Sequence, residues 1–195
     1  MAACSSARYM EDGKYILDQN RIDMIRPAEN ISPEDLRSLV RQQPHKKTLG
    51  IFRASTWAWY YSHQGKPTSL KRWMQRTIAR EPVILDTSLS LSSAGLIDLY
   101  MENKGHFGNR IRYSVRTRKK SARVTFHVTP GTTYRIDSVR MTNPDPTLSH
   151  FIQPDLANSL LQPGSIYDVD VLDDERDRIV AQLKEYGYYA FVKEY

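Results

Sequence analysis

The sequence contains one cysteine and no long apolar stretch, and each of these shortages excludes a class of protein. A single cysteine among 195 residues excludes an intramolecular disulfide framework and a zinc site built from cysteines. No run of 18 apolar residues occurs, so we expect no segment to cross a bilayer as a helix. A hydrophobic content of 40% is nevertheless sufficient for a packed core and argues against disorder.

The signatures of common enzyme classes are also missing. The five histidines are scattered, and the sequence has no HExxH motif, no glycine-rich phosphate loop and no GxSxG motif. The acidic residues between Asp168 and Asp177 are explained more simply as carboxylates at the positive end of a helix than as a metal site. We therefore expect no enzyme, no cofactor and no metal.

The net charge of +6 is distributed unevenly along the chain. Residues 44–81 contain eight Lys or Arg and one acid, and residues 110–123 contain seven Lys or Arg and no acid. The rest of the chain holds 13 bases and 21 acids. Two local cationic surfaces on an acidic body indicate particular binding faces, and not a general affinity for polyanions.

Cys4 lies among small residues near the start of the sequence, in Ala2-Ala3-Cys4-Ser5-Ser6. One interpretation is a free thiol in a frayed tail. The other is the attachment cysteine of a lipoprotein with a trimmed signal, because three residues are too few for the apolar core of a complete signal. We expect lipidation at Cys4, with residues 1–13 as a short tether.

Two segments of the chain, residues 82–107 and 164–189, repeat at a constant offset of 82 residues. Each has an extended X-Ile-X-Asp, a helical stretch, a glycine that ends the helix, and an aromatic residue that opens a strand. The equivalent pairs include Ile84 and Ile166, Asp86 and Asp168, Ile97 and Ile179, Gly105 and Gly187, and Phe107 and Tyr189. We expect Ser88 and Asp170 to cap the two helices.

Further strands and helices flank each repeat. Alternation of apolar and polar residues over 110–116 and 123–128 predicts a hairpin with one buried and one basic face, joined by a polar turn at 117–121. The other predicted elements are strands at 14–25 and 134–143, a helix from Ser32 to about Gln43, and a helical stretch at 147–161. The order strand–helix–helix–strand–strand predicts an α+β fold of two modules, residues 14–132 and 133–195. The first module carries an insertion at 44–81, and the second is incomplete at its C-terminus.

Several short motifs carry a resemblance to a known family. They are Tyr100–Phe107 (YMENKGHF), Val128–Ile136 (VTPGTTYRI), Leu161–Asp168 (LQPGSIYD), Glu175–Ile179 (ERDRI) and Gly187–Phe191 (GYYAF). In this order they resemble tandem POTRA domains, the periplasmic modules of the BamA/TamA (Omp85) outer-membrane assembly proteins. Cys4 and the following Gly13–Asp18 (GKYILD) are most similar to the Bacteroidetes lipoprotein branch, TamL.

The resemblance implies a three-stranded sheet covered by two helices in each domain, with the second domain truncated. It implies a longer chain at the periplasmic side of the outer membrane, with further POTRA domains and a membrane β-barrel. The implied partners are outer-membrane protein clients, a TamB-like inner-membrane partner, and outer-membrane lipid through the N-terminal anchor. A POTRA protein of cell division or of a secretion pore is a related alternative that lacks the lipoprotein start.

The first candidate binding surface is a strand edge. Unpaired N–H and C=O groups at an edge can add an incoming strand, and in this topology we expect residues 109–117 at an edge. The residues of this surface are Arg110, Arg112, Ser114 and Arg116. The arginines would deter uncontrolled stacking and could attract acidic partners or lipid headgroups, or they could simply be solvated edge charges.

The second candidate surface is the insertion, which contains all three tryptophans. Its membrane- or partner-facing residues are predicted to be Trp57, Trp59, Tyr60, Tyr61, Lys71, Arg72 and Trp73. Residues 69–80 fit an amphipathic helix, and mixed aromatic and cationic side chains are typical of a membrane interface. The alternative is that the aromatic residues pack the core of a small subdomain.

A basic nucleic-acid-binding domain is the main alternative from another class. Basic strands with Tyr113 and Phe126 could imitate a sheet on which bases stack. These two rings are, however, predicted on the apolar face, away from the arginines, whereas an RNA-binding sheet exposes its aromatic residues. We therefore expect no nucleic-acid partner, and strong salt-dependent binding of single-stranded RNA would favour the alternative.

Overall fold

The computed structural model describes residues 13–45, 58–59, 61–63, 65–77, 79, 81–140 and 158–193. The chain divides into two compact units. The first unit comprises Met1–Arg26, Ser32–Asp98 and Ile111–Thr129, and the second comprises Pro27–Ile31, Leu99–Arg110 and Pro130–Tyr195. Among the described residues, no helix has the length and apolarity that a membrane span requires.

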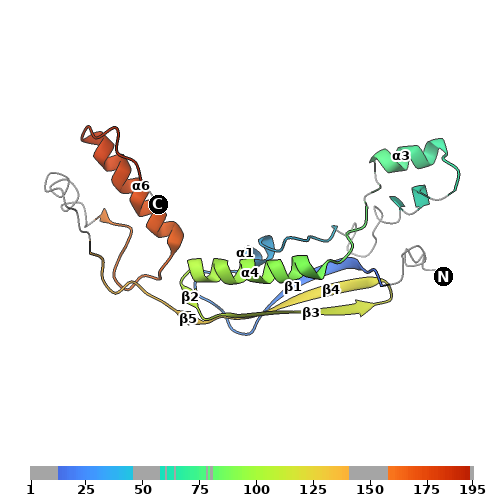
Figure 1. The fold of residues 1–195 in the computed structure, drawn as a ribbon, viewed down its shortest axis with the longest axis horizontal. Helices are drawn as coiled ribbons and strands as arrows, with labels where there is room; N and C mark the ends of the chain where they lie inside the picture. Colours follow the sequence, from blue (N-terminus) through green and yellow to red (C-terminus); the bar gives the residue numbers. More distant parts are fainter. Residues whose placement is uncertain are drawn as a thin grey trace. The chain divides into compact units, whose positions relative to one another are not determined.

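The first unit is built on a mixed three-stranded sheet (Figure 1). Its strands are β1 (Ile16–Met24), β3 (Arg110–Arg118) and β4 (Ser121–Thr129), in the spatial order β1-β4-β3. β1 runs parallel to β4, and β3 and β4 form an antiparallel hairpin around the two-residue turn Lys119–Lys120. β4 is therefore central, and β1 and β3 are the edges of this sheet.

Alternating side chains give the sheet one buried face. Val124, Phe126 and Val128 of β4 are at most 1% exposed, whereas the residues between them face the other side. β1 departs from strict alternation, because both Ile16 and Leu17 are buried. A register shift between Leu17 and Gln19 accounts for this, since a bulge moves the following side chains to the opposite face.

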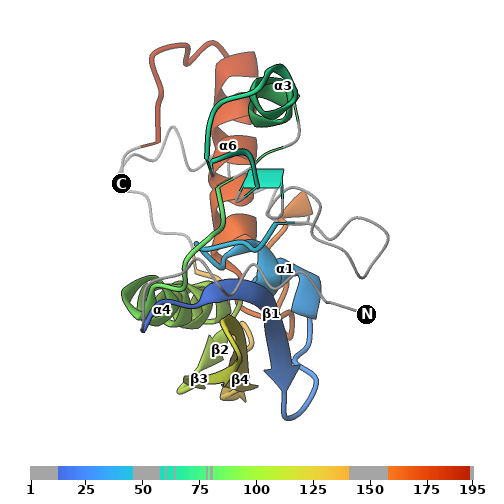
Figure 2. The same cartoon turned by 90° about the vertical axis from the view of Figure 1, so that its right-hand side faces the viewer.

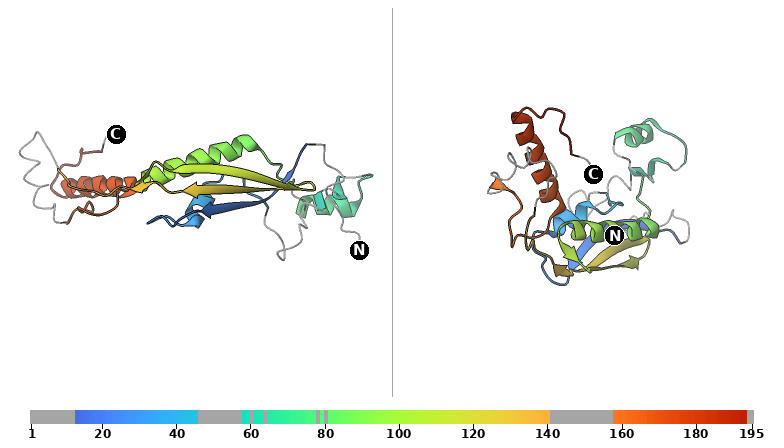
Figure 3. Two further views of the ribbon diagram at one scale, coloured as in Figure 1. Left: turned by 90° about the horizontal axis from the view of Figure 1, so that it is seen from below. Right: turned by 60° about the vertical axis from the view of Figure 1, so that its left-hand side comes forward.

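The helices α1 and α4 lie on one face of this sheet, as Figures 2 and 3 show. α1 (Pro33–Ser38) begins with a capping box, in which the Ser32 hydroxyl accepts from the Asp35 N–H at 3.2 Å and the Asp35 carboxylate accepts from the Ser32 N–H at 2.9 Å. α4 (Thr87–Asn103) buries Ser93, Ala94 and Ile97 within the first unit. The prediction of an α+β fold is confirmed, and the order in this unit is β-α-α-β-β once the additional helix α3 (Ser69–Thr77) between α1 and α4 is set aside.

The second unit has less sheet. β2 (His106–Phe107) pairs antiparallel with β5 (Thr132–Thr133), and the long helix α6 (Val169–Glu185) follows. A separate bridge joins Arg135 to Ile166. The core of this unit contains Met101 and Leu183, which are fully buried, and His106, which is 1% exposed.

Some predicted elements of the second module differ in the structure. In the strand expected at 134–143, the described residues 134–140 pair only at 134–136, with residues 164–167, and residues 141–143 lie outside the described residues. Residues 188–193 form no strand, and a hydrogen bond from the Phe191 N–H to the Tyr188 carbonyl at 3.0 Å closes a turn there. An extended segment becomes a strand only with a hydrogen-bonded neighbour, and the described part of this unit offers none to residues 188–193. Residues 147–157 of the predicted helical stretch lie outside the described residues, and residues 158–161 form no α-helix.

The long helices of the two units are equivalent at the offset of 82 residues. α4 and α6 have the same length, and both their first and last residues correspond at this offset. Gly105 and Gly187 follow them with φ of +84° and +94°, as predicted for the glycine that ends a helix. The capping prediction was wrong, because the caps are Asp86 and Asp168, whose carboxylates accept from the N–H two residues later at 2.8 and 2.9 Å.

The segments before these helices are equivalent at a second offset, of 119 residues. In the first unit the Leu17 N–H donates to the Val83 carbonyl and the Leu85 N–H donates to the Tyr15 carbonyl. The second unit repeats both bonds, from Ile136 to Ser165 and from Tyr167 to Tyr134. The Gln43 amide donates to the Val40 carbonyl at 2.8 Å, and the Gln162 amide donates to the Ser159 carbonyl at 2.6 Å.

The two offsets differ by 37 residues, which measures the extra chain in the first copy. Pro44 corresponds to Pro163 at one offset, and Pro82 corresponds to Gly164 at the other. Residues 45–81 therefore have no counterpart in the second copy. Their regular element is α3 (Ser69–Thr77), together with short helical pieces at 58–59 and 61–62.

Candidate partner-binding surfaces

The structure places Arg110, Arg112, Ser114 and Arg116 on β3, which has β4 as its one neighbour among the described strands. These four side chains are exposed, while Ile111, Tyr113 and Val115 between them are half-buried. The Tyr113 ring faces inward toward Phe126, with a centroid distance of 6.3 Å. β3 therefore combines an apolar face, a polar face with arginines, and a free edge.

The hairpin geometry indicates which backbone groups of β3 are free. In a hairpin with a two-residue turn, the residues that flank the turn, here Arg118 and Ser121, form a hydrogen-bonded pair. Every second residue back along β3, Ser114 included, then bonds to β4. The N–H and C=O groups of Tyr113 and Val115 point away from β4 and are available to an added strand.

A row of hydrogen-bonded polar side chains crosses the open face of the sheet. The Ser114 hydroxyl lies 2.9 Å from Nε2 of His127, and Nδ1 of His127 lies 3.2 Å from Oδ2 of Asp23. The sequence placed Ser114 and His127 on one face of the hairpin, but the parallel pairing that brings in Asp23 of β1 could be found only in the structure.

The order of Ser114, His127 and Asp23 in this row matches that of the Ser-His-Asp triad of hydrolases. The His127 and Asp23 side chains are 42% and 47% exposed, and neither the depression around the β3–β4 turn nor that beside Tyr15 and Leu85 includes them. Nucleophilic catalysis needs a site that positions substrate and excludes water. We therefore interpret this row of side chains as a polar link between the three strands.

The described part of the insertion contains an amphipathic helix. In α3, Met74 is buried while Leu70 and Trp73 are 58% and 52% exposed. The predicted residues Lys71 and Arg72 lie on the same helix, beside Trp73. Two large apolar side chains are thus exposed among basic ones, and the contact of this surface with a membrane or partner stays a prediction.

The other predicted residues of the insertion lie partly in its interior. Trp59 is half-buried and its ring stacks on His63 at a centroid distance of 4.5 Å. Tyr61 is 44% exposed, and the Lys71 ammonium lies 5.4 Å from the centre of its ring. The Gln75 amide donates to the Ser62 carbonyl at 3.0 Å and so joins α3 to this piece. Trp57, Tyr60 and Cys4 lie outside the described residues.

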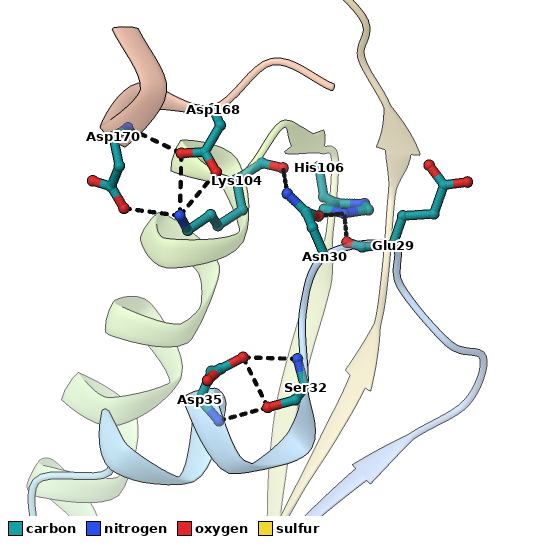
Figure 4. A network of polar contacts seen from close by, with 8 residues as sticks. All are labelled: Glu29, Asn30, Ser32, Asp35, Lys104, His106, Asp168 and Asp170. Carbon is teal, nitrogen blue, oxygen red and sulfur yellow. Dashed lines mark hydrogen bonds and ion pairs between the residues drawn. The ribbon is translucent and has the colours of Figure 1, made fainter. Parts of the chain in front are cut away.

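An ion-pair cluster occupies the second unit, at the start of α6 (Figure 4). The Lys104 ammonium donates to both oxygens of Asp168, at 2.9 and 3.1 Å, and to Asp170 at 2.8 Å. Burial alone would lower the pKa of Lys104, but the hydrogen bonds to Asp168 and Asp170 outweigh it and raise the pKa well above its usual value. Lys104 is therefore charged at neutral pH, and its hydrogen bonds hold the cap of α6.

Tight backbone packing and a buried histidine adjoin this cluster. Nε2 of His106 lies 2.9 Å from the Glu29 carbonyl and 3.2 Å from the Asn30 side-chain oxygen. A Cβ on Gly105 would overlap the Tyr167 carbonyl, and one on Gly131 would overlap the Phe107 carbonyl. These contacts fix the second unit, and no catalytic role follows from them.

Several acidic residues of α6 form structural ion pairs. Lys193 bridges Asp173 at 2.9 Å and Asp177 at 2.7 Å, and the buried Glu175 pairs with Arg178 at 2.8 Å. Among the residues that the structure describes, no group of three His, Cys, Asp or Glu is arranged to hold a metal ion.

Comparisons with known proteins find several similar solved structures, of which two are described here. No family model and no curated protein matches the chain. The structure of POTRA1-2 of the periplasmic domain of Omp85 from Anabaena is 13% identical, with 90% of this chain and 81% of that chain covered and a TM-score of 0.34. That of POTRA1-3 of the same domain is 14% identical, with 90% and 52% covered and a TM-score of 0.34, so this chain spans about half its length. Our fold assignment rests on the topology described above and not on these two similarities.

Proposed function

We propose that the chain is the tandem POTRA region of an outer-membrane assembly protein of the Omp85 type, with domains at about 14–132 and 133–195. The observation that carries this proposal is the repeated module. The first copy has the order β-α-α-β-β, apart from the insertion helix, with a free edge at β3. Its long helix and the hydrogen-bonded segment before that helix recur in the second copy. In this role the chain binds other proteins in the periplasm and catalyses no reaction.

The proposed mechanism is strand addition at β3. An extended segment of an outer-membrane protein client would pair with the outward N–H and C=O groups of Tyr113 and Val115. Backbone pairing tolerates many client sequences, because it uses groups that every residue carries. Arg110, Arg112 and Arg116 beside the edge favour acidic partners and oppose pairing between two copies of this basic strand.

Anchoring and further partners complete the proposal. Lipidation of Cys4, with residues 1–13 as a tether, would hold the protein at the periplasmic side of the outer membrane, as in the TamL branch. The exposed Leu70 and Trp73 with Lys71 and Arg72 support a contact of the insertion with membrane or partner, since a lipid anchor and a basic aromatic surface bind more strongly together than either alone. A TamB-like inner-membrane partner is the corresponding protein partner.

A proline in β3 tests strand addition directly. Val115→Pro removes an outward N–H and leaves the ladder to β4 in place, whereas Val115→Ala makes a similar loss of packing and keeps the N–H. We expect Val115→Pro to lower photo-crosslinking of the full-length protein to nascent barrel proteins by about tenfold, from a lost hydrogen bond and a steric block.

The control variant defines the outcome that would contradict this mechanism. Val115→Ala should crosslink as the parent protein does, and both variants should keep the circular dichroism of the fold. Equal crosslinking for Val115→Pro and Val115→Ala would show that clients do not pair with this edge.

A further inference from the structure

The tip of the β3–β4 hairpin borders a strongly cationic depression of about 630 Å³. It is formed by the end of β3, the turn, the start of β4 and two residues of β1, Ile16 and Asp18. Asp18 is its one carboxylate. The cationic residues that line it are Arg116, Arg118, Lys119, Lys120 and Arg123.

The backbone around this depression is fixed by hydrogen bonds. The Ile16 N–H donates to the Lys120 carbonyl at 2.9 Å, and β1 continues alongside β4 in parallel register from Ile16 opposite Ser121. Among the described residues, no carboxylate forms an ion pair with Arg116, Arg118 or Arg123. These three arginines therefore line the depression without an ion-paired carboxylate in the described part of the chain, and Asp18 is the single acidic side chain beside five basic ones.

The turn itself adds an independent observation. Lys119 has φ of +56°, in the left-handed region, at the first position of a two-residue hairpin turn. Every other described residue with a left-handed φ is glycine or asparagine, the types that tolerate this conformation. A lysine here is unfavourable for folding, and backbone strain of this kind is concentrated at functional sites.

We propose that this depression binds the phosphate groups of anionic lipid headgroups. Arginine and lysine are the side chains that recognise phosphate, through bidentate pairing and point charge. A cluster of five basic residues fits a surface on which phosphates are repeated, because each basic residue near an anionic membrane adds to the attraction.

The placement of the aromatic residues in the hairpin argues against a single-stranded nucleic acid as the ligand. Base stacking needs exposed aromatic rings, but Phe126 is fully buried and Tyr113 is half-buried with its ring tilted against Phe126. The described residues that line the depression include no aromatic side chain. The proposal does not depend on strand addition, since it uses side chains at the hairpin tip and not the backbone of β3.

Binding of lipid vesicles by variants of these basic residues tests the proposal. The probe is vesicles of phosphatidylcholine with and without phosphatidylglycerol, and the variants are Lys119→Gly and the double change Arg118→Gln with Arg123→Gln. Binding to the anionic vesicles should fall about fivefold for each charge removed, which is the equivalent of about 1 kcal/mol per basic residue at such a surface. Lys119→Gly should at the same time raise Tm, because glycine adopts the left-handed turn without strain.

Control variants and competing ligands make each outcome decisive. Lys184→Gln, which removes an exposed lysine of α6, should bind vesicles as the parent does, and Val115→Pro should leave vesicle binding unchanged even if client crosslinking is lost. The proposal is overturned if Lys119→Gly is more stable yet binds anionic vesicles equally well. Tighter binding to inorganic phosphate than to vesicles would assign a free phosphate instead of a membrane. Tighter binding to single-stranded RNA would assign a nucleic acid.

Discussion

The two copies of the module contain the same helix and the same hydrogen-bonded segment before it, but they bury that helix to different extents. Met101 of α4 and Leu183 of α6, which are equivalent, are both fully buried. One turn earlier, Ile97 is fully buried, whereas its counterpart Ile179 is half-buried. The first copy has a three-stranded sheet against its helix, and the described part of the second copy has only short pairings.

The comparison teaches that residues next to the helix in sequence specify where it begins and ends, whereas its burial depends on a partner surface from elsewhere in the chain. An aspartate immediately before the helix and a left-handed glycine two residues beyond it define both ends in each copy. These signals act over a few residues and do not need the sheet. The apolar stripe needs a partner surface, so it is fully buried only where the sheet is present.

A buried polar position shows the same function performed by different residues. Ser93 of α4 accepts the Arg41 N–H at 3.0 Å, and the equivalent Glu175 of α6 accepts the Leu160 N–H at 3.0 Å. Burial alone would raise the pKa of Glu175, but hydrogen bonds from Arg178 and from the Leu160 N–H lower it below its usual value. In both copies this side chain fixes the segment that crosses the helix.

The largest expected effect is a difference in the free energy of unfolding between alanine variants of the two glycines that end the helices. Gly187→Ala forces alanine into a left-handed φ in open space, and we expect a loss of about 1 kcal/mol in the free energy of unfolding. Gly105→Ala adds an overlap with the Tyr167 carbonyl, so the loss should be about 3 kcal/mol.

Urea denaturation of the two alanine variants measures this difference. Both glycines belong to the second unit, so the same unfolding transition reports both changes. Equal losses would mean that Gly105 has no close contact of its own and that the two helix ends are alike in surroundings as well as in conformation.

A smaller effect is expected at a position where the copies differ. Lys104 corresponds to Tyr186, so the ion pairs with Asp168 and Asp170 have no counterpart in the second copy. The Lys104 and Asp168 side chains are only 17% and 14% exposed. Lys104→Met should therefore lower the free energy of unfolding by about 2 kcal/mol, since a charged hydrogen-bonded pair is lost.

The pH dependence of this loss has a definite sign. The folded-state pKa of Lys104 is raised, so its contribution is fully present below the unfolded value of about 10.4 and is lost as the pH rises further, through the folded-state value. Denaturation curves should show a constant difference between parent and Lys104→Met at neutral pH and a shrinking one in strong alkali. The control Lys184→Met should differ by less than about 0.5 kcal/mol at every pH.

Much of the fold could be predicted because its signals are local and repeated. The offset of 82 residues, the glycines at its helix ends and the alternation of β3 and β4 were all visible in the sequence. The second offset was missed, although Gln43-Pro44 and Gln162-Pro163 are visible too, because residues 45–81 separate the two halves of the first copy. The caps were misassigned by two residues, since several aspartates and serines near each helix start could serve.

Features that depend on distant pairing could not be predicted. The link from Ser114 through His127 to Asp23 joins residues that are far apart in sequence and meet only across parallel strands. The short pairing at 134–136 likewise depends on residues 164–167. Which tryptophans are exposed depends on how the insertion packs, and no periodicity in the sequence distinguished Trp59 from Trp73.

The central claim is that both copies share one module and that residues 45–81 are extra to it. The most direct measurement replaces residues 45–82 with a single glycine, which reproduces the Gln-Pro-Gly of the second copy, and follows amide hydrogen exchange in the first unit. The account predicts slow exchange at Leu17, Arg41 and Leu85, whose N–H groups bond to Val83, Ser93 and Tyr15. Exchange of these three amides at the rate of an unfolded chain would show that the insertion is part of the module and would contradict the account.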